Sequence, residues 1–398
     1  MRIKLNLIFL MFITLTLTMC QCSLNQQELY QGKPIIKVDI AWRSAVYQNA
    51  NFAYLVSGNT AYIPEGDGVA AVNLDSGAIK WRINGTFVPG SNIEKIGEYL
   101  YLFEDYYSPA ESAISNDITY ARIAKIKIDG TSIEMMIVGS DIGWTTRMAY
   151  LSSDSTFLYW GTKTANNFSN NKLVKLNPST MEKEVIYTTT NEFMSKILIS
   201  NNIAYVGHIP QAGISHFNIH GTITVINLSN NTVIWEKTPN YANYMGAFPF
   251  VIKDDRLYVI DGSGTACYNK NTGEEIFDNN EAEGGYFGGC IFNGDYAYFT
   301  SPLYNGKRVY CINRNTGAIV WSDSGEQLGT TPHINNGVLY VAEQTHLRLY
   351  NATNGQVIGV TTSIKGQTFQ LSPTERYKDL MLICNDEGMV AVRMNYKL

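Results

Sequence analysis

The sequence has little charge and no concentration of positive charge. Charged residues make up 16% of the 398 positions, and 30 Lys and Arg stand against 35 Asp and Glu, which gives a formal net charge of −5. Nucleic-acid binding usually requires a basic patch or stripe that neutralises phosphates. Without a basic run, nucleic acid is excluded as an expected partner.

Cysteine is also scarce, and no C-x-x-C motif occurs among the six cysteines. This excludes a thiol-redox or zinc-ribbon site. Cys267 and Cys311 each stand six residues before a glycine in a similar stretch, so we expect them to be small buried strand residues rather than two halves of a bridge. Cys290 and Cys384 share no such spacing, and disulfides among the four remain open.

Catalytic motifs and helical periodicity are missing as well. The chain contains no G-x-S-x-G, H-E-x-x-H or P-loop, and no convincing i, i+3, i+4, i+7 apolar pattern after the N-terminus. What the sequence does contain is 26 Tyr and 33 Gly. These residues favour strands joined by tight turns, so we predict an all-β protein.

The N-terminus differs from the rest of the chain. Arg2 and Lys4 precede fifteen mostly apolar residues, 5–19, and the next charge is Glu28. That stretch is shorter than the ~20 residues of a membrane span and is typical of a secretory signal peptide. We therefore expect export, after which the net charge moves from −5 to −7 because Arg2 and Lys4 are removed.

The sequence Leu17-Thr18-Met19-Cys20 resembles a bacterial lipobox, in which the cysteine is lipidated and becomes the first residue. Met19 departs from the Gly, Ala or Ser usual at that position. The resemblance implies a signal peptide over 1–19, lipid attachment at Cys20 and a lipid-anchored polar tether over 20–34. Ordinary signal cleavage without a lipid is the alternative.

The remaining residues, 35–398, repeat one hairpin. The stretch V-Y-C-I-N-R-N-T-G-A-I-V-W-S-D at 309–323 closely matches T-A-C-Y-N-K-N-T-G-E-E-I-F-D-N at 265–279. Seven copies are centred near Gly77, Gly130, Ser179, Asn231, Gly273, Gly317 and Gly355. Another alternating pair of strands precedes most copies, which makes four strands every 38 to 53 residues, the pattern of a β-propeller.

The ends of the chain indicate eight blades. Three strands follow the seventh copy, and the alternating segment 34–44 can supply the fourth. We therefore predict an eight-bladed β-propeller of four-stranded antiparallel blades, with the last blade closed by the N-terminal strand. Five aromatic rings are expected to pack between blades, because four of them stand four residues after a turn position: Trp42, Trp81, Trp235, Phe277 and Trp321.

Turn and ring together, as in N-R-N-T-G-A-I-V-W and N-L-D-S-G-A-I-K-W, resemble the repeat of the pyrroloquinoline-quinone (PQQ)-like propellers. That family contains periplasmic quinoprotein dehydrogenases, which bind PQQ and calcium. It also contains non-enzymatic lipoproteins such as BamB, an assembly factor for outer-membrane barrels. The resemblance implies the fold strongly and leaves the function open.

The enzymatic branch is disfavoured by the residues present. The adjacent cysteines found beside the quinone in those dehydrogenases are missing, and only Arg147 and Lys365 are candidate cations near the channel. Asp254, Asp255 and Asp278 are expected in exposed turns. We therefore expect no cofactor, no metal and no catalytic residue.

The loop between the second and third strands varies most among the blades. It is long in blades two, three and four, and propeller connectivity places these loops on one face. They carry the candidate partner-binding residues Tyr106, Tyr107, Tyr120, Phe168, His208, His216, Phe217 and His220. The three histidines share one segment with no carboxylate or cysteine, so we expect solvated loop residues rather than a metal site.

These observations predict an exported, membrane-anchored lipoprotein in the periplasm or at the cell surface. Its propeller would act as a non-catalytic protein-interaction scaffold, with outer-membrane protein assembly as one role. A cell-envelope module that binds a glycan or another small ligand is the alternative, followed by a PQQ-dependent dehydrogenase.

Overall fold

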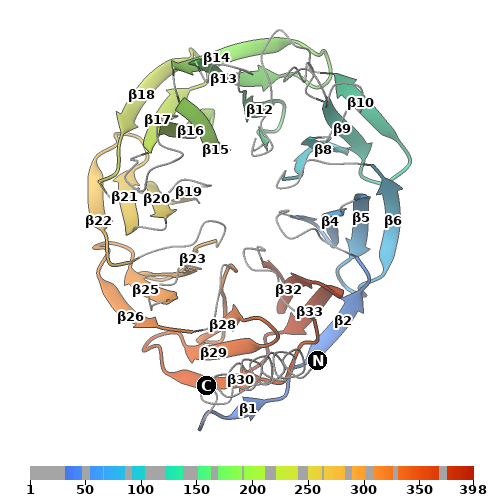
Figure 1. The fold of residues 1–398 in the computed structure, drawn as a ribbon, viewed down its shortest axis with the longest axis vertical. Coiled ribbons are helices and arrows are strands. Elements are labelled where there is room, and N and C mark those ends of the chain that lie inside the picture. The colour runs from blue at the N-terminus through green and yellow to red at the C-terminus, as the bar shows by residue number, and fades with distance from the viewer. Residues whose placement is uncertain are drawn as a thin grey trace, which may run out of the picture.

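The computed structural model describes residues 32–46, 54–65, 67–85, 92–103, 122–137, 151–162, 169–190, 192–210, 221–240, 250–261, 264–282, 289–301, 308–325, 330–366 and 374–398. Within them the regular structure is entirely β, and eight sheets form a ring around a central axis (Figure 1). No helix in these ranges is long and apolar enough to cross a membrane.

Each blade has four antiparallel strands in chain order from the axis to the rim. Blade 1 consists of β3 (Leu55–Ser57), β4 (Thr60–Glu65), β5 (Gly68–Asn73) and β6 (Ile79–Asn84), and blade 2 of β7 (Glu94–Ile96), β8 (Tyr99–Phe103), β9 (Arg122–Lys127) and β10 (Ile133–Ile137). Blade 3 consists of β11 (Ser152–Ser153), β12 (Leu158–Gly161), β13 (Ser169–Leu176) and β14 (Lys183–Thr190). Blade 4 consists of β15 (Glu192–Ser200), β16 (Ile203–Pro210), β17 (Thr222–Asn227) and β18 (Thr232–Lys237).

Blade 5 consists of β19 (Phe250–Lys253), β20 (Arg256–Asp261), β21 (Gly264–Asn269) and β22 (Glu275–Asn279). Blade 6 consists of β23 (Ile291–Asn293), β24 (Tyr296–Thr300), β25 (Val309–Asn313) and β26 (Ile319–Asp323). Blade 7 consists of β27 (His333–Asn335), β28 (Val338–Ala342), β29 (Leu347–Asn351) and β30 (Val357–Thr361). Blade 8 takes β31 (Glu375–Tyr377), β32 (Leu380–Asn385) and β33 (Gly388–Arg393) from the C-terminus.

The N-terminal segment closes the ring, as predicted. Strand β2 (Ile40–Ser44) pairs antiparallel with β33 and becomes the outer strand of blade 8. The predicted strand 34–44 is nevertheless divided, because β1 (Ile35–Ile36) pairs in parallel with β30 and adds a fifth strand to blade 7. The N-terminus therefore bridges the two blades at which the ring closes (Figure 1).

Six of the seven repeated turns owe their shape to the asparagine that opens them, and in blade 2 Lys127 stands at that position. The Oδ1 atom of Asn313 accepts the N–H groups of Asn315 and Thr316, and Gly317 N–H donates to Asn313 O at 2.8 Å. Gly317 itself has φ +73°, a left-handed conformation that glycine adopts without strain. In blade 3 that position is Met181, with φ 63°, and not Ser179, two residues earlier, where the sequence placed it.

One row of residues in each blade faces the following blade, and its second-strand member is a tyrosine in seven of the eight. These residues are Tyr62, Tyr101, Tyr159, Tyr205, Tyr258, Tyr298 and Tyr340, with Leu382 in blade 8. The Tyr298 hydroxyl donates to Ala352 O in the next blade at 3.2 Å. These tyrosines are therefore a second set of aromatic residues between the blades, which the sequence analysis did not predict.

The outer-strand member of this row is the aromatic ring found in the sequence. The ring of Trp321 lies on the turn of the next blade, where a Cβ at Gly355 would come 2.5 Å from Trp321 Cδ2, and its Nε1 donates to Ala352 O at 2.9 Å. Trp42, Trp81, Trp235 and Phe277 lie in the same way against Gly77, Gly130, Gly273 and Gly317. These five rings therefore occupy five seams between blades.

The seams from blade 2 to 3 and from blade 3 to 4 are built differently. In these rows a Lys–Glu pair replaces the ring: Lys125 and Glu134 are 3.2 Å apart, and Lys175 and Glu184 are 3.4 Å apart. The next blade then presents Met181 or Asn231, which carry a Cβ, instead of glycine. Asn231 Nδ2 also donates to Glu184 Oε1 at 2.6 Å.

The cysteines of the described ranges are free thiols. Cys267 and Cys311 are the third-strand members of their rows, paired with Phe277 and Trp321, and both are fully buried. Burial raises the pKa of each thiol to about 12. A small side chain fits here because the neighbouring ring covers it, which agrees with the expectation of buried strand residues.

Candidate functional site

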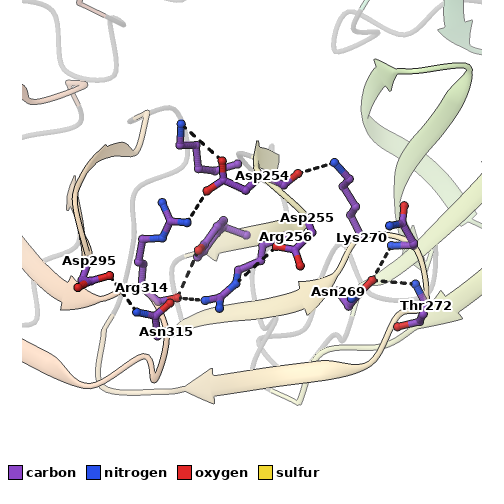
Figure 2. Close-up of polar contacts among 12 residues, drawn as sticks. Asp254, Asp255, Arg256, Asn269, Lys270, Thr272, Asp295, Arg314 and Asn315 are labelled. Carbon is purple, nitrogen blue, oxygen red and sulfur yellow. Dashed lines mark hydrogen bonds and ion pairs between the residues drawn. The ribbon is translucent and has the colours of Figure 1, made fainter.

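The polar side chains on the two faces of the propeller make different kinds of contact. Figure 2 shows the face of the tight turns at blades 5 and 6, where Asp254 in the turn before β20 contacts Arg314 in the turn after β25. Arg256 Nη1 donates to Arg314 O at 2.7 Å. The Asp254 side chain is 52% exposed, as expected for a turn residue. These contacts join neighbouring blades and mark the turn face as structural.

Asp278 was also expected in an exposed turn, and that expectation is wrong. It lies in strand β22 and is half-buried, and burial raises the pKa of its carboxyl. The hairpin turn of this copy ends earlier, at Gly273, so that residues 275–279 are already strand.

The second strands end, and the third strands begin, at the other face. Residues 104–121, 162–168 and 211–221 join β8 to β9, β12 to β13 and β16 to β17. Blade 6 has a connection of similar length, 301–308, about which the sequence analysis made no prediction. Seven of the eight candidate loop residues, and Cys20, fall outside the described ranges: Tyr106, Tyr107, Tyr120, Phe168, His216, Phe217 and His220.

His208 is the one candidate loop residue that the structure describes, and the expectation of a solvated loop is wrong for it. The residue lies inside strand β16, paired with Met194 and Thr222, and its side chain is 0% exposed. Burial lowers the pKa of its imidazole to about 4. His208 therefore belongs to the base of the loop face and not to a surface that a partner could touch.

The position of His208 is polar in every blade. It is the sixth residue of the second-strand repeat, three after the row tyrosine, and the equivalents are Glu65, Glu104, Thr162, His208, Asp261, Ser301, Glu343 and Asn385. Six of them are at most 3% exposed: Glu65, Thr162, His208, Ser301, Glu343 and Asn385. A ring of buried polar side chains thus lies beneath the loops, at a place where burial demands hydrogen-bond partners.

In blades 1 and 7 an arginine side chain is a hydrogen-bond partner of the buried residue at this position. The Arg82 Nε–Glu65 Oε2 and Nη2–Glu65 Oε1 distances are 2.7 and 2.9 Å, a bidentate pair. In blade 7, Arg348 Nε donates to Glu343 Oε1 at 2.6 Å, and His346 Nε2 lies 2.7 Å from Glu343 Oε2. Burial opposes ionisation of Glu343, but the bonds from His346 and Arg348 outweigh it and lower the pKa of the carboxyl.

Blades 3 and 8 satisfy the position through the main chain. Thr162 Oγ1 accepts Lys172 N–H at 3.0 Å across the two strands it joins. Asn385 Oδ1 accepts Glu387 N–H at 3.0 Å and its Nδ2 donates to Lys365 O at 2.8 Å. The ring therefore anchors the loop hairpins to their blades, which gives the loops a rigid base.

A second polar group lies on the inner strands of blades 2 to 4. Ser153 Oγ and Asn92 Nδ2 each donate to the Glu94 carboxylate at 2.6 Å. Burial raises the pKa of Glu94 to about 7, although Lys196 of β15 opposes the shift. Burial also lowers the pKa of Lys196. At blade 8, Glu375 has the equivalent position, and burial raises its pKa to about 7.

The residues around this face do not fit a quinone that carries several carboxylates. Such a group needs cations that are free to pair with it. Arg82 and Arg348 are already bound to Glu65 and Glu343, and Lys196 faces Glu94. Lys365 is exposed on the connection from β30 to β31, and Arg147 lies outside the described residues. No group of three or more His, Cys, Asp or Glu among the described residues could hold a metal ion.

A family model described as the outer membrane protein assembly factor BamB matches residues 281–393. BamB from Moraxella catarrhalis has a similar structure, with a TM-score of 0.61 and 12% identity over 89% of this chain and 99% of that one. A europium-containing methanol dehydrogenase gives 0.62 and 10% over 87% and 84%. A quinohemoprotein alcohol dehydrogenase from Comamonas testosteroni gives 0.62 and 9% over 93% and 78%.

No curated protein sequence matches the chain. At these identities the structural likenesses establish the fold, and they include BamB as well as two dehydrogenases. The family model matches at the level of sequence, over the residues that form blades 6 to 8. The resemblance found in the sequence is thus confirmed over residues 281–393, and the chain has the fold of an eight-bladed β-propeller similar to that of BamB.

Proposed function

We propose that this protein is an exported lipoprotein whose propeller binds a protein partner in the cell envelope and catalyses no reaction. The loop face of blades 2 to 4 is the proposed contact surface. The N-terminal pattern of 1–19 followed by Cys20 supports export and anchoring, and the tether over 20–34 gives the propeller its reach from the bilayer.

The observation that carries the proposal is the buried polar ring below these loops. Four described members, Glu65, Thr162, Glu343 and Asn385, bond to another strand or loop of the propeller, as Thr162 does in blade 3 and Glu65 in blade 1. A hairpin fixed at its base presents its loop on a rigid support, the arrangement on which binding loops are usually found. The aromatic composition of residues 104–120 suits a protein surface.

The BamB match supports the kind of partner. This chain spans 99% of the Moraxella BamB chain, and the family model carries the name of an outer-membrane protein assembly factor. We therefore propose outer-membrane protein assembly as the process in which the scaffold acts. Three described cations of the loop face, Arg82, Lys196 and Arg348, are already opposed by Glu65, Glu94 and Glu343, which disfavours the quinoprotein alternative.

In-cell photo-crosslinking tests the contact surface. A photoreactive residue at Tyr106, Phe168 or Phe217 should capture a discrete protein partner, whereas one at Asp254 on the turn face should not. Deleting residues 104–120 should abolish capture from Phe168 while leaving the thermal unfolding temperature within a few degrees. Equal capture from both faces, or a deletion without effect on capture, would contradict the proposal.

Metabolic labelling with a fatty-acid analogue tests the anchor. Wild-type protein should incorporate the lipid and sediment with membranes, and Cys20→Ala should do neither. Outer-membrane barrel proteins should fall in abundance when the gene is deleted. If barrel levels are unchanged while crosslinking to a partner persists, the scaffold proposal stands and its assignment to barrel assembly is wrong.

A further inference from the structure

The polar ring has one member whose hydrogen-bonding capacity is unused. His208 is fully buried, and neither Nδ1 nor Nε2 has a hydrogen-bond partner. Its equivalents in blades 1 and 7 are bound by arginine, and those in blades 3 and 8 by the main chain. A buried imidazole with both nitrogens unpaired is costly, because each group has lost water without gaining a substitute.

A carboxylate at the start of blade 4, directly after the connection from blade 3, lies beside this imidazole. The Nδ1 atom of His208 is 3.7 Å from Oε2 of Glu192, the first residue of β15. This is too long for a hydrogen bond. Zinc–nitrogen and zinc–oxygen bonds are each about 2.0–2.2 Å, so a separation of 3.7 Å matches the distance that a single bridging ion sets between its two ligand atoms.

The surroundings hold the carboxylate in place. Thr189 Oγ1 donates to Glu192 Oε2 at 2.6 Å, and Asn171 Nδ2 donates to the Glu192 main-chain oxygen. The ring of Tyr187 stands edge-on to His208, with centroids 5.6 Å apart. Supporting contacts of this kind orient a metal ligand and are a regular part of metal sites.

We propose that His208 and Glu192 hold one transition-metal ion of the zinc, cobalt and nickel class at the seam between blades 3 and 4. The ion takes its first nitrogen ligand from the imidazole and its first oxygen ligand from the carboxylate. The Glu192 side chain is 29% exposed, so the ion enters from that side and keeps water as further ligands. This proposal is independent of the proposed function.

The protonation state of the imidazole is compatible with this role. Metal ions bind the neutral form of histidine. Burial lowers the pKa of His208 to about 4, so the imidazole is neutral at pH 7. The sequence alone offered no carboxylate near His208, because Glu192 is sixteen residues away and only the pairing of β15 with β16 brings the two together.

Zinc binding to the purified full chain, first treated with a chelator, tests the proposal. Isothermal titration with zinc chloride should give about one ion per chain, and zinc should raise the thermal unfolding temperature by at least about 3 °C. Cobalt should give a visible absorption band. His208→Gln and Glu192→Gln should each weaken zinc binding at least about tenfold.

His333→Gln is the matched control, because His333 is also buried but its Nε2 already lies 2.9 Å from Thr374 Oγ1. It should bind zinc as the wild type does. Glu192→Gln keeps the test decisive if His208→Gln fails to fold. Absence of zinc binding to the wild type, which would leave a buried water as the partner of His208, would overturn the proposal. Zinc binding unchanged in both variants would overturn it as well, because other residues would then hold the ion.

Discussion

The indole ring of Trp321 lies against the α-carbon of Gly355 so closely that a Cβ there would come 2.5 Å from Cδ2. The same relation holds at four other seams, and it accounts for two of the three seams that lack a ring, those from blade 2 to 3 and from blade 3 to 4. Where the turn residue is Met181 or Asn231, its Cβ would occupy the place of the ring, and the preceding outer strand carries Glu134 or Glu184 instead. Ring and glycine therefore form one unit, and neither is replaced alone.

Replacing the glycine under a ring should destabilise the fold. Gly355→Ala adds a Cβ that clashes with Trp321, in addition to the strain of φ +71°. We expect a loss of about 2–4 kcal/mol in the free energy of unfolding. Gly97→Ala is the matched control, since Gly97 has φ +58° with nothing within 4 Å of its Cβ position, and it should cost about 1 kcal/mol. Equal losses in urea denaturation would show that the ring contact contributes nothing.

The indole N–H should matter where it is the donor to the turn carbonyl. Trp235 Nε1 donates to Lys270 O at 3.1 Å, so Trp235→Phe should cost about 1–2 kcal/mol. Phe277→Trp should bring no gain, because the equivalent carbonyl, Arg314 O, already accepts from Arg256 and Tyr258. Chemical denaturation of both variants checks this pair, and a stabilising Phe277→Trp would contradict it.

The seam between blades 3 and 4 should be convertible to the ring form only by two changes together. Glu184→Trp alone meets the Cβ of Asn231, and Asn231→Gly alone removes the bond to Glu184. We expect each single variant to lose about 1 kcal/mol and the double variant to recover at least that much. A double-mutant cycle in denaturation experiments measures the coupling, and additive losses would disprove it.

Strand β1 should stabilise the seam between blades 7 and 8, where neither a ring nor a Lys–Glu pair is present in the described rows. Gly359 occupies the ring position, and a Cβ there would lie 2.6 Å from Pro34 O and 2.8 Å from Ile36 Cδ1. Ile36 packs against the buried cluster of blades 7 and 8. Both Ile36→Asp and Gly359→Ala should cost about 1–3 kcal/mol.

The two changes act on one contact, so the double variant should lose little more than the worse single variant. Ile35→Asp is the control, because Ile35 is 77% exposed, and it should leave stability unchanged within about 0.5 kcal/mol. Thermal unfolding of the four proteins checks the set. An effect of Ile35→Asp as large as that of Ile36→Asp would mean that β1 is not packed as described.

Acid should destabilise the propeller through its buried histidines. Burial lowers the pKa values of His208 and His333 to about 4, whereas unfolded histidine titrates near 6.5. The unfolded state therefore binds more protons, and stability falls as the pH drops from about 6.5 to 4. His333→Gln should remove up to about 3 kcal/mol of this loss at pH 4. Denaturation at pH 7, 5.5 and 4.5 checks it, and an unchanged slope would contradict it.

Glu375 should act in the opposite direction. Burial raises the pKa of its carboxyl to about 7, above the unfolded value near 4.3, so ionisation costs stability as the pH rises through that interval. Glu375→Gln should therefore stabilise the protein at pH 8 by about 1–3 kcal/mol and have little effect at pH 4. A variant that is less stable at pH 8 would show that the carboxylate has a partner.

The architecture was predictable because its signals are local and repeated. The asparagine, the left-handed glycine and the ring four residues later, as in Asn313, Gly317 and Trp321, act within one hairpin, and the seven copies of the hairpin average out the uncertainty of each. The strand β1 was not separable from β2, because two residues give no periodicity. His208 was assigned to one loop together with His216 and His220, yet pairing with β15 and β17 makes it strand.

The sequence by itself determined the number of blades, the closure by β2 and the face from which the long loops leave, since these follow from period and chain direction. Only the tertiary structure decided which side chains meet across a seam. Glu94 with Lys196 and Glu184 with Asn231 come from different blades, and His208 meets Glu192 only through the pairing of β15 with β16. Their proximity depends on the packing of sheets, and no spacing along the chain encodes it.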